Sequence, residues 1–379
     1  MAVCVVAPKE VAPGEKRVAL VPEVAGRLAK AGHRVCVETG AGEDAGFTDT
    51  EFTAAGAQIV GTAKELYGSA DIVLKVQPPT AAESKLMREG TVVIALMNAS
   101  RNLDLVATMR DRNLTAFALE LVPRITRAQS MDALSSQATA AGYKAVLIAA
   151  ELSPRFLPML TTAAGTIRPA KVLILGAGVA GLMAIATARR LGGMVEGYDV
   201  RRAAGEQVRS LGAKFLELQI NAEGAGGYAR ELTPEEKALE SKMVSDAVAQ
   251  ADLVITTAAI PGRKAPVLVT KETVGRMKPG SVLIDLAAET GGNCELTKAG
   301  KTIQVNDVTI VGPLNLPSQT AYHASQMYSK NLQAFLGLLI TSDGKLVTDY
   351  SDEILAASLL VAGGTVRHKP TADLLVAGK

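Results

Sequence analysis

The residues best suited to bind a ligand form a glycine-rich run near the middle of the chain. Positions 176–181 read Gly-Ala-Gly-Val-Ala-Gly; the apolar residues 172–175 precede them and an alanine-rich helical pattern follows, ending at Gly192. A second apolar run ends at Asp199, 18 residues beyond Gly181. This order predicts a strand, a glycine turn, a helix and a second strand, which together bind the diphosphate of a dinucleotide.

Each glycine of this run has its own steric reason. Gly176 permits the tight turn, Gly178 lets the backbone approach a pyrophosphate, and Gly181 lets the helix pack closely on its strand. The free N–H groups and partial positive charge at the helix start favour an anion there. Because a chain with 35 glycines produces GxGxxG by chance, the setting between strand and helix carries the prediction.

Asp199 indicates which dinucleotide binds. A carboxylate at this position accepts hydrogen bonds from the adenosine ribose 2′-OH and repels a 2′-phosphate, so the site favours NAD(H) over NADP(H). Arg201 and Arg202 follow at once and are alternative ligands for a 2′-phosphate. While Asp199 is present, solvated arginines at a helix start are the better interpretation of these two residues.

A second polar cluster follows the predicted strand 114–119. Arg124, Gln129, Asp132 and Ser135 bring several kinds of hydrogen-bonding group to the carboxyl end of a strand, where open α/β sheets bind ligands. Helix capping and surface polarity are the alternative interpretation. We expect the following helix to span 131–152 with Ser130 as its N-cap.

Two further segments contain candidate residues. Residues 221–230 contain three glycines in four positions, followed directly by Tyr228. We expect this segment to be a lid over the cleft, with an exposed loop as the alternative. Near the N-terminus, Arg17 and the residues Pro8-Lys9-Glu10 are joined by Lys75 at another strand end. Basic residues there could hold a small carboxylate; ordinary surface lysines and arginines are the alternative.

The elements that must position these residues alternate along the chain between strand-like and helix-like patterns. This alternation predicts an α/β fold with two Rossmann-like, doubly wound parallel-sheet domains, the nucleotide-binding one inserted in the other. We expect residues 1–135 and 308–379 to form the first domain and 136–307 the second, with 153–169 as a connector. The strands expected are 2–7, 34–38, 71–76, 91–96, 114–119, 172–175, 194–198, 214–218, 253–256 and 282–285, and the helices include 22–30 and 322–341.

Composition excludes several classes of protein. With 379 residues, 48% hydrophobic and 21% charged, the chain is expected to be soluble and globular. A formal charge of +2 and only 3% aromatic residues argue against nucleic-acid binding. Neither a bilayer-spanning apolar stretch nor a signal-peptide pattern is present. Three separated cysteines indicate reduced thiols in the cytosol, and the spacing of the three histidines predicts no metal site.

At these places the chain resembles the alanine dehydrogenase and transhydrogenase alpha-subunit superfamily. The opening with Arg17, Lys75, the fingerprint at Gly176 and the run 285–292 carry the resemblance, which covers nearly the whole chain. In alanine dehydrogenase a histidine lies in the segment that matches 95–98, and an aspartate stands where this chain has Glu289. Here the histidine is missing, which argues against an amine-forming reduction, because that reaction needs a proton donor near neutral pH.

The segment from Arg124 to Asp132 instead resembles the signature loop of the NAD(H)-binding component of proton-translocating transhydrogenase, and 226–228 is similar to its mobile loop. That resemblance implies direct hydride transfer from NADH to NADP⁺ bound on a partner, which requires ring alignment rather than acid–base catalysis. It assigns nicotinamide positioning to Arg124, Gln129, Asp132 and Ser135, with Tyr228 as the lid residue. The cofactor-binding residues expected are Gly176, Gly178, Val179, Ala180, Gly181, Asp199, Val200, Arg201, Thr256, Ala258, Ile260 and Pro261. The segment 256–261, at the end of the strand 253–256, is expected to line the cleft.

The resemblance also implies partners. It predicts a homodimer on the cytoplasmic face of the inner membrane, docked on an NADP(H)-binding beta subunit and on a membrane-spanning second alpha polypeptide, without inserting into the bilayer itself. Two alternatives remain. One is an alanine dehydrogenase-like, NAD-dependent amino-acid dehydrogenase, and the other is an NAD-sensing or structural subunit without its own reaction.

Overall fold

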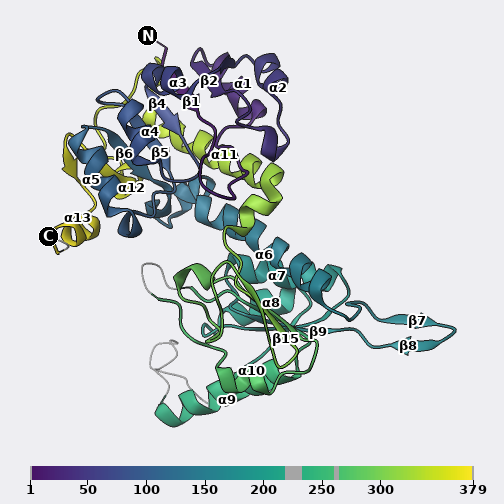
Figure 1. The fold of residues 1–379 in the computed structure, drawn as a ribbon. Helices are drawn as coiled ribbons and strands as arrows, with labels where there is room; N and C mark the ends of the chain where they lie inside the picture. The colour runs from purple at the N-terminus through teal and green to yellow at the C-terminus, as the bar shows by residue number, and fades with distance from the viewer. Residues whose placement is uncertain (1, 218–232, 260–263, 378–379) are drawn as a thin grey trace. The chain divides into compact units, whose positions relative to one another are not determined.

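The computed structural model describes residues 2–217, 233–259 and 264–377, which divide into two compact units (Figure 1). Unit 1 comprises Met1–Gln137 and Pro317–Lys379, and unit 2 comprises Ala138–Leu316. The sequence predicts the second junction at 307/308, whereas the units divide at 316/317. The reason lies in unit 2, because the Asn315 N–H donates to Glu289 Oε1 at 3.0 Å and Leu316 packs into the core of that unit.

Unit 1 contains an eight-stranded sheet in the order β17-β16-β6-β5-β4-β1-β2-β3. Strands β1 to β6 are parallel, and β16 and β17 pair antiparallel at one edge. Its strands are β1 Cys4–Ala7, β2 Arg34–Glu38, β3 Gln58–Val60, β4 Ile72–Leu74, β5 Val92–Ala95, β6 Thr115–Ala118, β16 Leu359–Ala362 and β17 Thr365–Val366. Its helices are α1 Pro22–Lys30, α2 Asp49–Ala54, α3 Ala63–Ser69, α4 Ala81–Leu86, α5 Leu103–Asp111, α11 Ala321–Leu339, α12 Glu353–Ser358 and α13 Lys369–Ala377.

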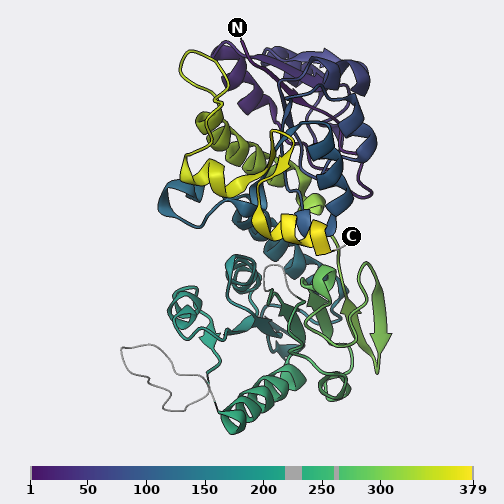
Figure 2. The same ribbon diagram turned by 90° about the vertical axis from the view of Figure 1, so that its left-hand side faces the viewer.

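Both faces of the unit 1 sheet are covered, so its central strands are hydrophobic throughout. In β1, Val5 and Ala7 face one core cluster while Cys4 and Val6 face another. This pattern is typical of parallel strands with helices on both faces (Figures 1 and 2). Helix α11 contributes to the first cluster a buried stripe at helical spacing: Ala321, Tyr328, Leu332, Phe335, Leu336 and Leu339.

Unit 2 contains a seven-stranded sheet in the order β11-β10-β9-β12-β13-β15-β14, parallel except for the pair β14–β15. Its strands are β9 Lys171–Leu175, β10 Met194–Tyr198, β11 Lys214–Phe215, β12 Leu253–Thr256, β13 Val282–Asp285, β14 Thr302–Val305 and β15 Val308–Val311. Its helices are α7 Val179–Arg190, α8 Ala204–Ser210, α9 Pro234–Gln250 and α10 Lys271–Gly275, together with most of α6 Ala133–Leu152. The doubly wound fold class predicted from the sequence is confirmed.

In both sheets the second and third strands lie on one side of the first strand, and the fourth lies on its other side. The first four strands of unit 1 and of unit 2 are ordered 3-2-1-4, so the switch lies between β1 and β4 in one unit and between β9 and β12 in the other. Ligands of open α/β sheets bind beyond the carboxyl ends of the strands at such a switch point. In each unit a ligand site is therefore expected at the carboxyl ends of the strands beside the switch point; this side of the sheet is called its carboxyl edge.

The segment 153–169, expected as a plain connector, contains a β-hairpin. Strands β7 Leu160–Thr162 and β8 Gly165–Ile167 pair antiparallel as a separate sheet and extend away from the rest of unit 2 (Figure 1). The short hairpin is missed from sequence because Pro158 and Pro169 bracket two strands of only three residues each.

Within the part of the chain that the structure describes, no helix is both long and apolar enough to span a bilayer. No three histidine, cysteine, aspartate or glutamate side chains among these described residues gather closely enough to hold a metal ion. Cys4, Cys36 and Cys294 are buried free thiols.

Candidate nucleotide-binding site

The glycine turn between β9 and α7 shows why three of its positions lack a side chain. Gly176 has a φ of +105°, and a Cβ there would overlap the Thr257 hydroxyl. A Cβ on Gly181 would overlap the carbonyl oxygen of Gly176, so the helix lies directly against the turn. At Gly178, by contrast, a Cβ would meet no heavy atom within 4 Å. The protein itself leaves that space open.

The start of α7 faces this open space with polar backbone groups. Gly178 is the N-cap residue and has no side chain to accept a hydrogen bond from the first turn. Val179 is 42% exposed, and Ala180 is half-buried beside it. The N–H groups of this first turn and the helix dipole favour an anionic group such as a diphosphate.

Asp199 lies directly after β10 and is joined to the glycine turn. Its Oδ2 accepts a hydrogen bond from the Ala177 N–H at 2.8 Å, and its Oδ1 accepts from the Arg201 N–H at 2.8 Å and from Arg201 Nε at 3.0 Å. Burial by itself would raise the pKa of Asp199, but the hydrogen bonds from Arg201 and Ala177 outweigh it and lower the pKa. The side chain of Asp199 is 8% exposed and ionised, while that of Arg201 is 65% exposed. Val200 between them is 74% exposed.

The segment after β12 differs from the expectation that its side chains face a cleft. Thr256 is fully buried, and its hydroxyl donates to Asp285 Oδ1 of the neighbouring strand at 2.9 Å. Ala258 is half-buried, and its N–H is already bonded to Asn293 Oδ1 at 3.0 Å. Ile260 and Pro261 lie outside the described residues. Thr256 therefore links two strands, because its buried hydroxyl bonds to Asp285, the residue paired with it on β13.

Within the segment 256–261, Thr257 has a role that the sequence did not predict. Its Oγ1 donates to the Gly176 carbonyl at 3.1 Å, and its N–H donates to the Leu175 carbonyl at 2.8 Å. It thus ties the end of β12 to the glycine turn at the switch point. The signal for it was a hydroxyl residue in the first position after the strand that pairs with β9.

In unit 1 the segment around Gln129 is a 3₁₀-helix, Thr126–Met131, followed at once by α6. Arg124 and Gln129 are exposed, Asp132 and Ser135 are half-buried, and Tyr228 lies outside the described residues. Asp132 accepts from the Ser135 N–H at 2.9 Å and from Ser135 Oγ at 2.6 Å. Of the four polar residues, the structure joins this pair.

These contacts correct the expected helix start. The helix begins at Ala133 with Asp132 as its cap, and not at 131 with Ser130, because Ser130 belongs to the preceding 3₁₀-helix. The Ser130 carbonyl instead accepts from Asn331 Nδ2 of α11 at 2.8 Å. Arg127 pairs with Asp352 at 2.8 Å, which holds the same segment from another side. The backbone that carries Arg124 and Gln129 is therefore anchored while their side chains stay exposed.

Arg17 is buried rather than exposed on the surface, whereas Lys9 is exposed. Arg17 is bonded to Glu15 through Nε at 2.8 Å and Nη2 at 2.6 Å, and its Nη1 donates to Gln137 Oε1 at 2.7 Å. Burial alone would raise the pKa of Glu15, but hydrogen bonds from Arg17 outweigh it and lower the pKa to about 2. Arg17 is thus already paired with a carboxylate of its own unit.

Lys75 is fully buried between two carboxylates. Its Nζ lies 3.1 Å from Glu10 Oε2 and 2.9 Å from Glu83 Oε1, which also accepts from the Tyr67 hydroxyl at 2.6 Å. Burial by itself would lower the pKa of Lys75, but the two carboxylates raise it. The positive charges of Arg17 and Lys75, which the sequence offered for a small carboxylate, are therefore compensated within unit 1.

Comparison with known proteins places the chain in a family. The family described as alanine dehydrogenase/PNT matches twice, with its N-terminal domain over residues 6–141 and its C-terminal domain over residues 145–369. The chain is 48% identical to an NAD(P) transhydrogenase alpha-subunit polypeptide of Rhodospirillum rubrum, over 95% of this chain and 97% of that protein. It is 32% identical to the alanine dehydrogenase of Mycobacterium tuberculosis, over 82% of this chain and 80% of that protein.

A solved structure agrees with these sequence matches. The transhydrogenase from Sinorhizobium meliloti superposes with a TM-score of 0.89 at 47% identity, covering 96% of this chain and 99% of that one. Both domains of the family and the order in which the chain visits them are present here. The chain therefore belongs to the alanine dehydrogenase/PNT family.

Proposed function

We propose that this chain is the NAD(H)-binding component of a proton-translocating NAD(P) transhydrogenase, passing hydride directly between NADH and NADP⁺ held on a partner. The observation that carries this proposal is the 48% identity to a transhydrogenase alpha subunit across 95% of the chain, against 32% to an alanine dehydrogenase. The open glycine turn at Gly178 supports nucleotide binding independently, because a Cβ there meets nothing in the protein.

The residues of unit 2 have separate roles in this function. The first turn of α7 holds the diphosphate at Gly178, Val179 and Ala180, and Asp199 accepts a hydrogen bond from the adenosine ribose. The ionised state of Asp199, supported by its lowered pKa, disfavours a 2′-phosphate and so selects NAD(H). Val200 and Arg201, both largely exposed, line the ribose.

Unit 1 supplies the polar segment that aligns the nicotinamide. Arg124 and Gln129 present exposed side chains from an anchored backbone, and Asp132 and Ser135 are fixed by their mutual hydrogen bonds. Hydride transfer between two nicotinamide rings needs the reacting atoms about 3–3.5 Å apart, with water excluded, and needs no proton donor. Met97 and Asn98, in place of a histidine, fit that requirement. Tyr228, Ile260 and Pro261 complete the proposed set of cofactor contacts.

An oxo acid substrate fits unit 1 less well. Arg17 and Lys75 each lie against carboxylates of the same unit, at 2.6–3.1 Å. An incoming carboxylate would have to compete with those partners. This arrangement favours the transhydrogenase over the alanine dehydrogenase alternative.

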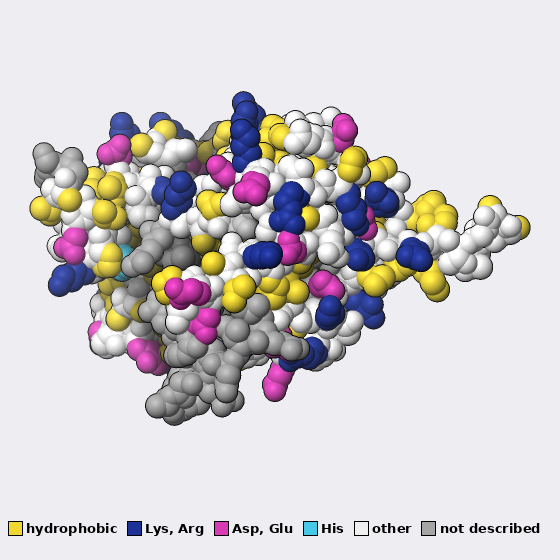
Figure 3. All heavy atoms as spheres, turned by 90° about the horizontal axis from the view of Figure 1, so that it is seen from below, with side chains coloured by type: hydrophobic (Ala, Val, Ile, Leu, Met, Phe, Trp, Pro, Cys, Tyr) yellow, Lys and Arg dark blue, Asp and Glu magenta, His cyan; other side chains and the backbone are white. Residues whose placement is uncertain are grey.

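The proposed partners are a second copy of the chain, an NADP(H)-binding beta subunit and a membrane-spanning second alpha polypeptide at the cytoplasmic face of the inner membrane. The hairpin β7–β8 supports the homodimer. Phe156, Met159 and Ile167 on or beside it are 59%, 63% and 43% exposed, and Figure 3 shows hydrophobic side chains along this projection. A two-stranded hairpin is marginal alone in water, so a surface that covers it stabilises it.

The decisive experiment mixes the purified chain with a separately prepared NADP(H)-binding partner. We expect hydride exchange between NADPH and an NAD⁺ analogue only when both proteins are present, and a molar mass in solution of twice 39.3 kDa for the chain alone. Rapid NADH oxidation by the chain alone with pyruvate and ammonia would instead establish the alanine dehydrogenase alternative. NADH binding with no exchange in the mixture would leave a sensing or structural subunit.

A further inference from the structure

Asn293 is a fully buried amide at the carboxyl edge of the unit 2 sheet, and all its polar groups are bonded. Its Oδ1 accepts from the Ala258 N–H at 3.0 Å, while its Nδ2 donates to the Ala258 carbonyl and the Pro266 carbonyl, both at 2.8 Å. Its own carbonyl accepts from Leu268 and Val269 at 2.8 and 3.0 Å. One side chain thus joins Ala258 and Pro266, the two ends of the segment 258–266.

The position of Asn293 is itself set by Asp285, the last residue of β13. The buried Asp285 Oδ2 accepts from the Asn293 N–H at 2.8 Å, from the Cys294 N–H at 3.0 Å and from Thr297 Oγ1 at 2.6 Å. Its Oδ1 accepts from the Thr256 hydroxyl at 2.9 Å. Since these bonds use both carboxylate oxygens, Asn293 is held rigidly to the ends of β12 and β13.

The same contacts lead to the glycine turn. Ala258, bonded on both sides of its peptide backbone by Asn293, directly follows Thr257. Thr257 Oγ1 donates to the Gly176 carbonyl at 3.1 Å, the same oxygen that a Cβ on Gly181 would overlap. The chain Asn293, Ala258, Thr257 and Gly176 therefore connects β13 with the turn where Gly178 leaves open space.

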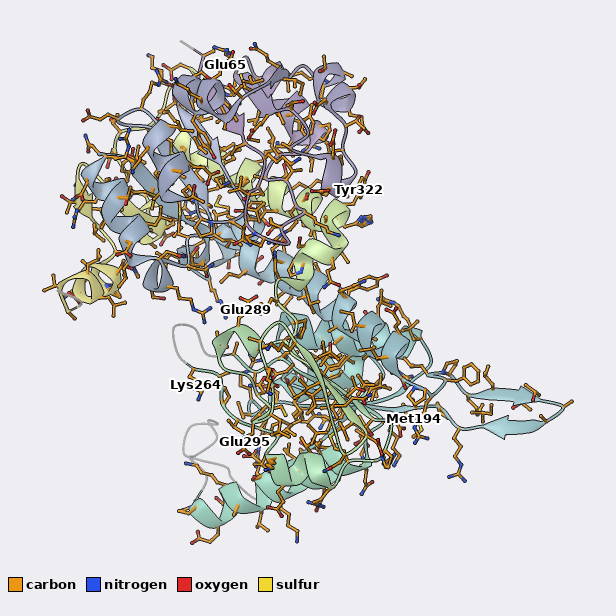
Figure 4. The ribbon with its side chains drawn as sticks, viewed as in Figure 1. Glu65, Met194, Lys264, Glu289, Glu295 and Tyr322 are labelled. Atoms are coloured by element: carbon orange, nitrogen blue, oxygen red, sulfur yellow. The ribbon has the colours of Figure 1, made fainter. Side chains whose placement is uncertain are left out.

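The opposite edge of the same sheet has a comparable buried link. Asp252, at the start of β12, accepts from the Lys171 N–H of β9 at 2.8 Å and from Lys278 Nζ at 2.9 Å, with 8% of its side chain exposed. Figure 4 shows this separation of the edges, with Met194 at the start of β10 lying across unit 2 from Lys264 and Glu289. Asp252 therefore joins strands of the same sheet at the edge away from the glycine turn.

We infer that Asn293 is a positioning residue of the nucleotide site: through Ala258 and Thr257 it sets the backbone of the Gly176 turn that holds the diphosphate. The inference depends on the proposed NAD(H) binding. It adds a residue more than a hundred positions from the fingerprint, which acts on the turn through Ala258. If Asn293 only satisfied buried backbone groups, its loss would lower stability, as loss of Asp252 would, without an effect on nucleotide affinity.

The test compares Asn293→Ala with Asp252→Ala in the full chain, measuring the NADH dissociation constant by fluorescence and the midpoint of thermal unfolding. We expect both variants to lower the midpoint. Asn293→Ala should raise the NADH dissociation constant about tenfold or more, while Asp252→Ala changes it less than about twofold. In hydride exchange with the partner, Asn293→Ala should raise the NADH KM by the same factor and leave the rate at saturating NADH within about twofold.

Thr257→Val provides a second measurement with little loss of volume, which serves if Asn293→Ala fails to fold. Removal of this hydroxyl should raise the NADH dissociation constant about threefold to tenfold, because it loses the contact with the Gly176 carbonyl and a longer one, 3.4 Å, with the Leu175 carbonyl. NADH affinity unchanged in a folded Thr257→Val or Asn293→Ala chain would overturn the inference, as would equal affinity losses for Asn293→Ala and Asp252→Ala. Failure of the wild-type chain to bind NADH would instead overturn the proposed function.

Discussion

The two units have the same strand order at their switch points, but the residues at the carboxyl ends of the strands differ there. In unit 2 the residues after β9 are Gly176-Ala177-Gly178, and a Cβ on Gly178 would meet nothing. In unit 1 the residues after β1 are Pro8-Lys9-Glu10, and Glu10 turns inward so that its Oε1 accepts from the Val76 N–H at 2.6 Å. The carboxyl edge of the unit 2 sheet is left open at Gly178, whereas that of unit 1 is filled by side chains such as Glu10.

This contrast shows that topology creates the opportunity for a site and the residues after the first strand decide its use. In unit 1, Lys75 follows β4 and lies fully buried among Glu10 and Glu83, and its carbonyl accepts from the Tyr328 hydroxyl at 2.7 Å. A buried charge cluster needs all its partners, because taking ions out of water is costly. The edge of unit 1 is therefore part of its core, while that of unit 2 is available to a nucleotide.

The largest effect is expected from breaking the unit 1 cluster. Lys75→Met leaves Glu10 and Glu83 buried without their cation, which should cost about 3–5 kcal/mol of stability. Thermal and denaturant unfolding measure this loss. The control is Lys330→Met, which removes a solvated pair with Glu23 at 3.7 Å and should cost less than about 1 kcal/mol. Equal losses in the two variants would show that the unit 1 edge is not a core.

A pH series examines a second buried ion pair of unit 1, that of Glu15 with Arg17. Because its pKa in the folded chain is lowered from 4.5 to about 2, Glu15 stabilises the fold above pH 4.5, and that contribution is lost as the pH falls towards 2. For a pKa shift of this extent, Glu15 contributes about 3 kcal/mol to the free energy of unfolding. The stability difference between the wild-type chain and Glu15→Gln should be constant near neutral pH and shrink below pH 4.5. A difference independent of pH would contradict the ionised pair with Arg17.

In unit 2 the corresponding experiment, Gly178→Ala, places a methyl group in the open space at the glycine turn. Gly178 has a φ of −77°, which alanine adopts without strain, so Gly178→Ala should leave stability within about 0.5 kcal/mol of the wild type. It should raise the NADH dissociation constant about tenfold to a hundredfold, because the methyl group occupies the space proposed for the diphosphate. Gly61→Ala, another position where a Cβ meets nothing, is the control for both measurements. Normal NADH binding by Gly178→Ala would mean that the nucleotide does not approach this turn.

The sequence predicted the fold class and most of the central strands, because parallel strands buried on both faces are continuous apolar runs bounded by turns. It also predicted the turn at Gly176, whose spacing to Asp199 is local. It missed the long-range contacts. Ser130 has the side chain of a helix cap, but Asn331, 201 residues away, uses its carbonyl, and Asp132 takes the cap.

The same limit explains the errors at the site. Thr256 was expected to line a cleft, but its neighbour across the sheet is Asp285, 29 residues later, and the hydroxyl bonds there. The roles of Asn293 and Thr257 were not predicted because they depend on which strands lie side by side at the switch point. Strand order is a property of the folded sheet, and no local pattern in the sequence encodes it.

A smaller effect is expected from Gln129, the residue proposed to align the nicotinamide. Gln129→Asn keeps the amide but shortens its reach, so NADH binding should change less than about twofold while hydride transfer slows about tenfold. Transient kinetics of the mixed proteins separates the two quantities. The exposed Arg127, which pairs with Asp352, provides the control, because Arg127→Lys changes the same segment away from Gln129. A raised NADH dissociation constant with an unchanged transfer rate would assign Gln129 to binding rather than alignment.

The smallest effect concerns which nucleotide the open edge accepts. Asp199→Asn keeps the size and an acceptor oxygen but removes the charge that repels a 2′-phosphate, and it weakens the hold on Arg201. Because Arg201 is then held less tightly, it can bind a 2′-phosphate. The preference for NADH over NADPH should therefore fall about threefold to tenfold. Dissociation constants for both nucleotides measure the preference. If it is unaltered, the selectivity for NAD(H) comes from the shape of the turn, and the contrast between the units would be one of space alone, not of charge.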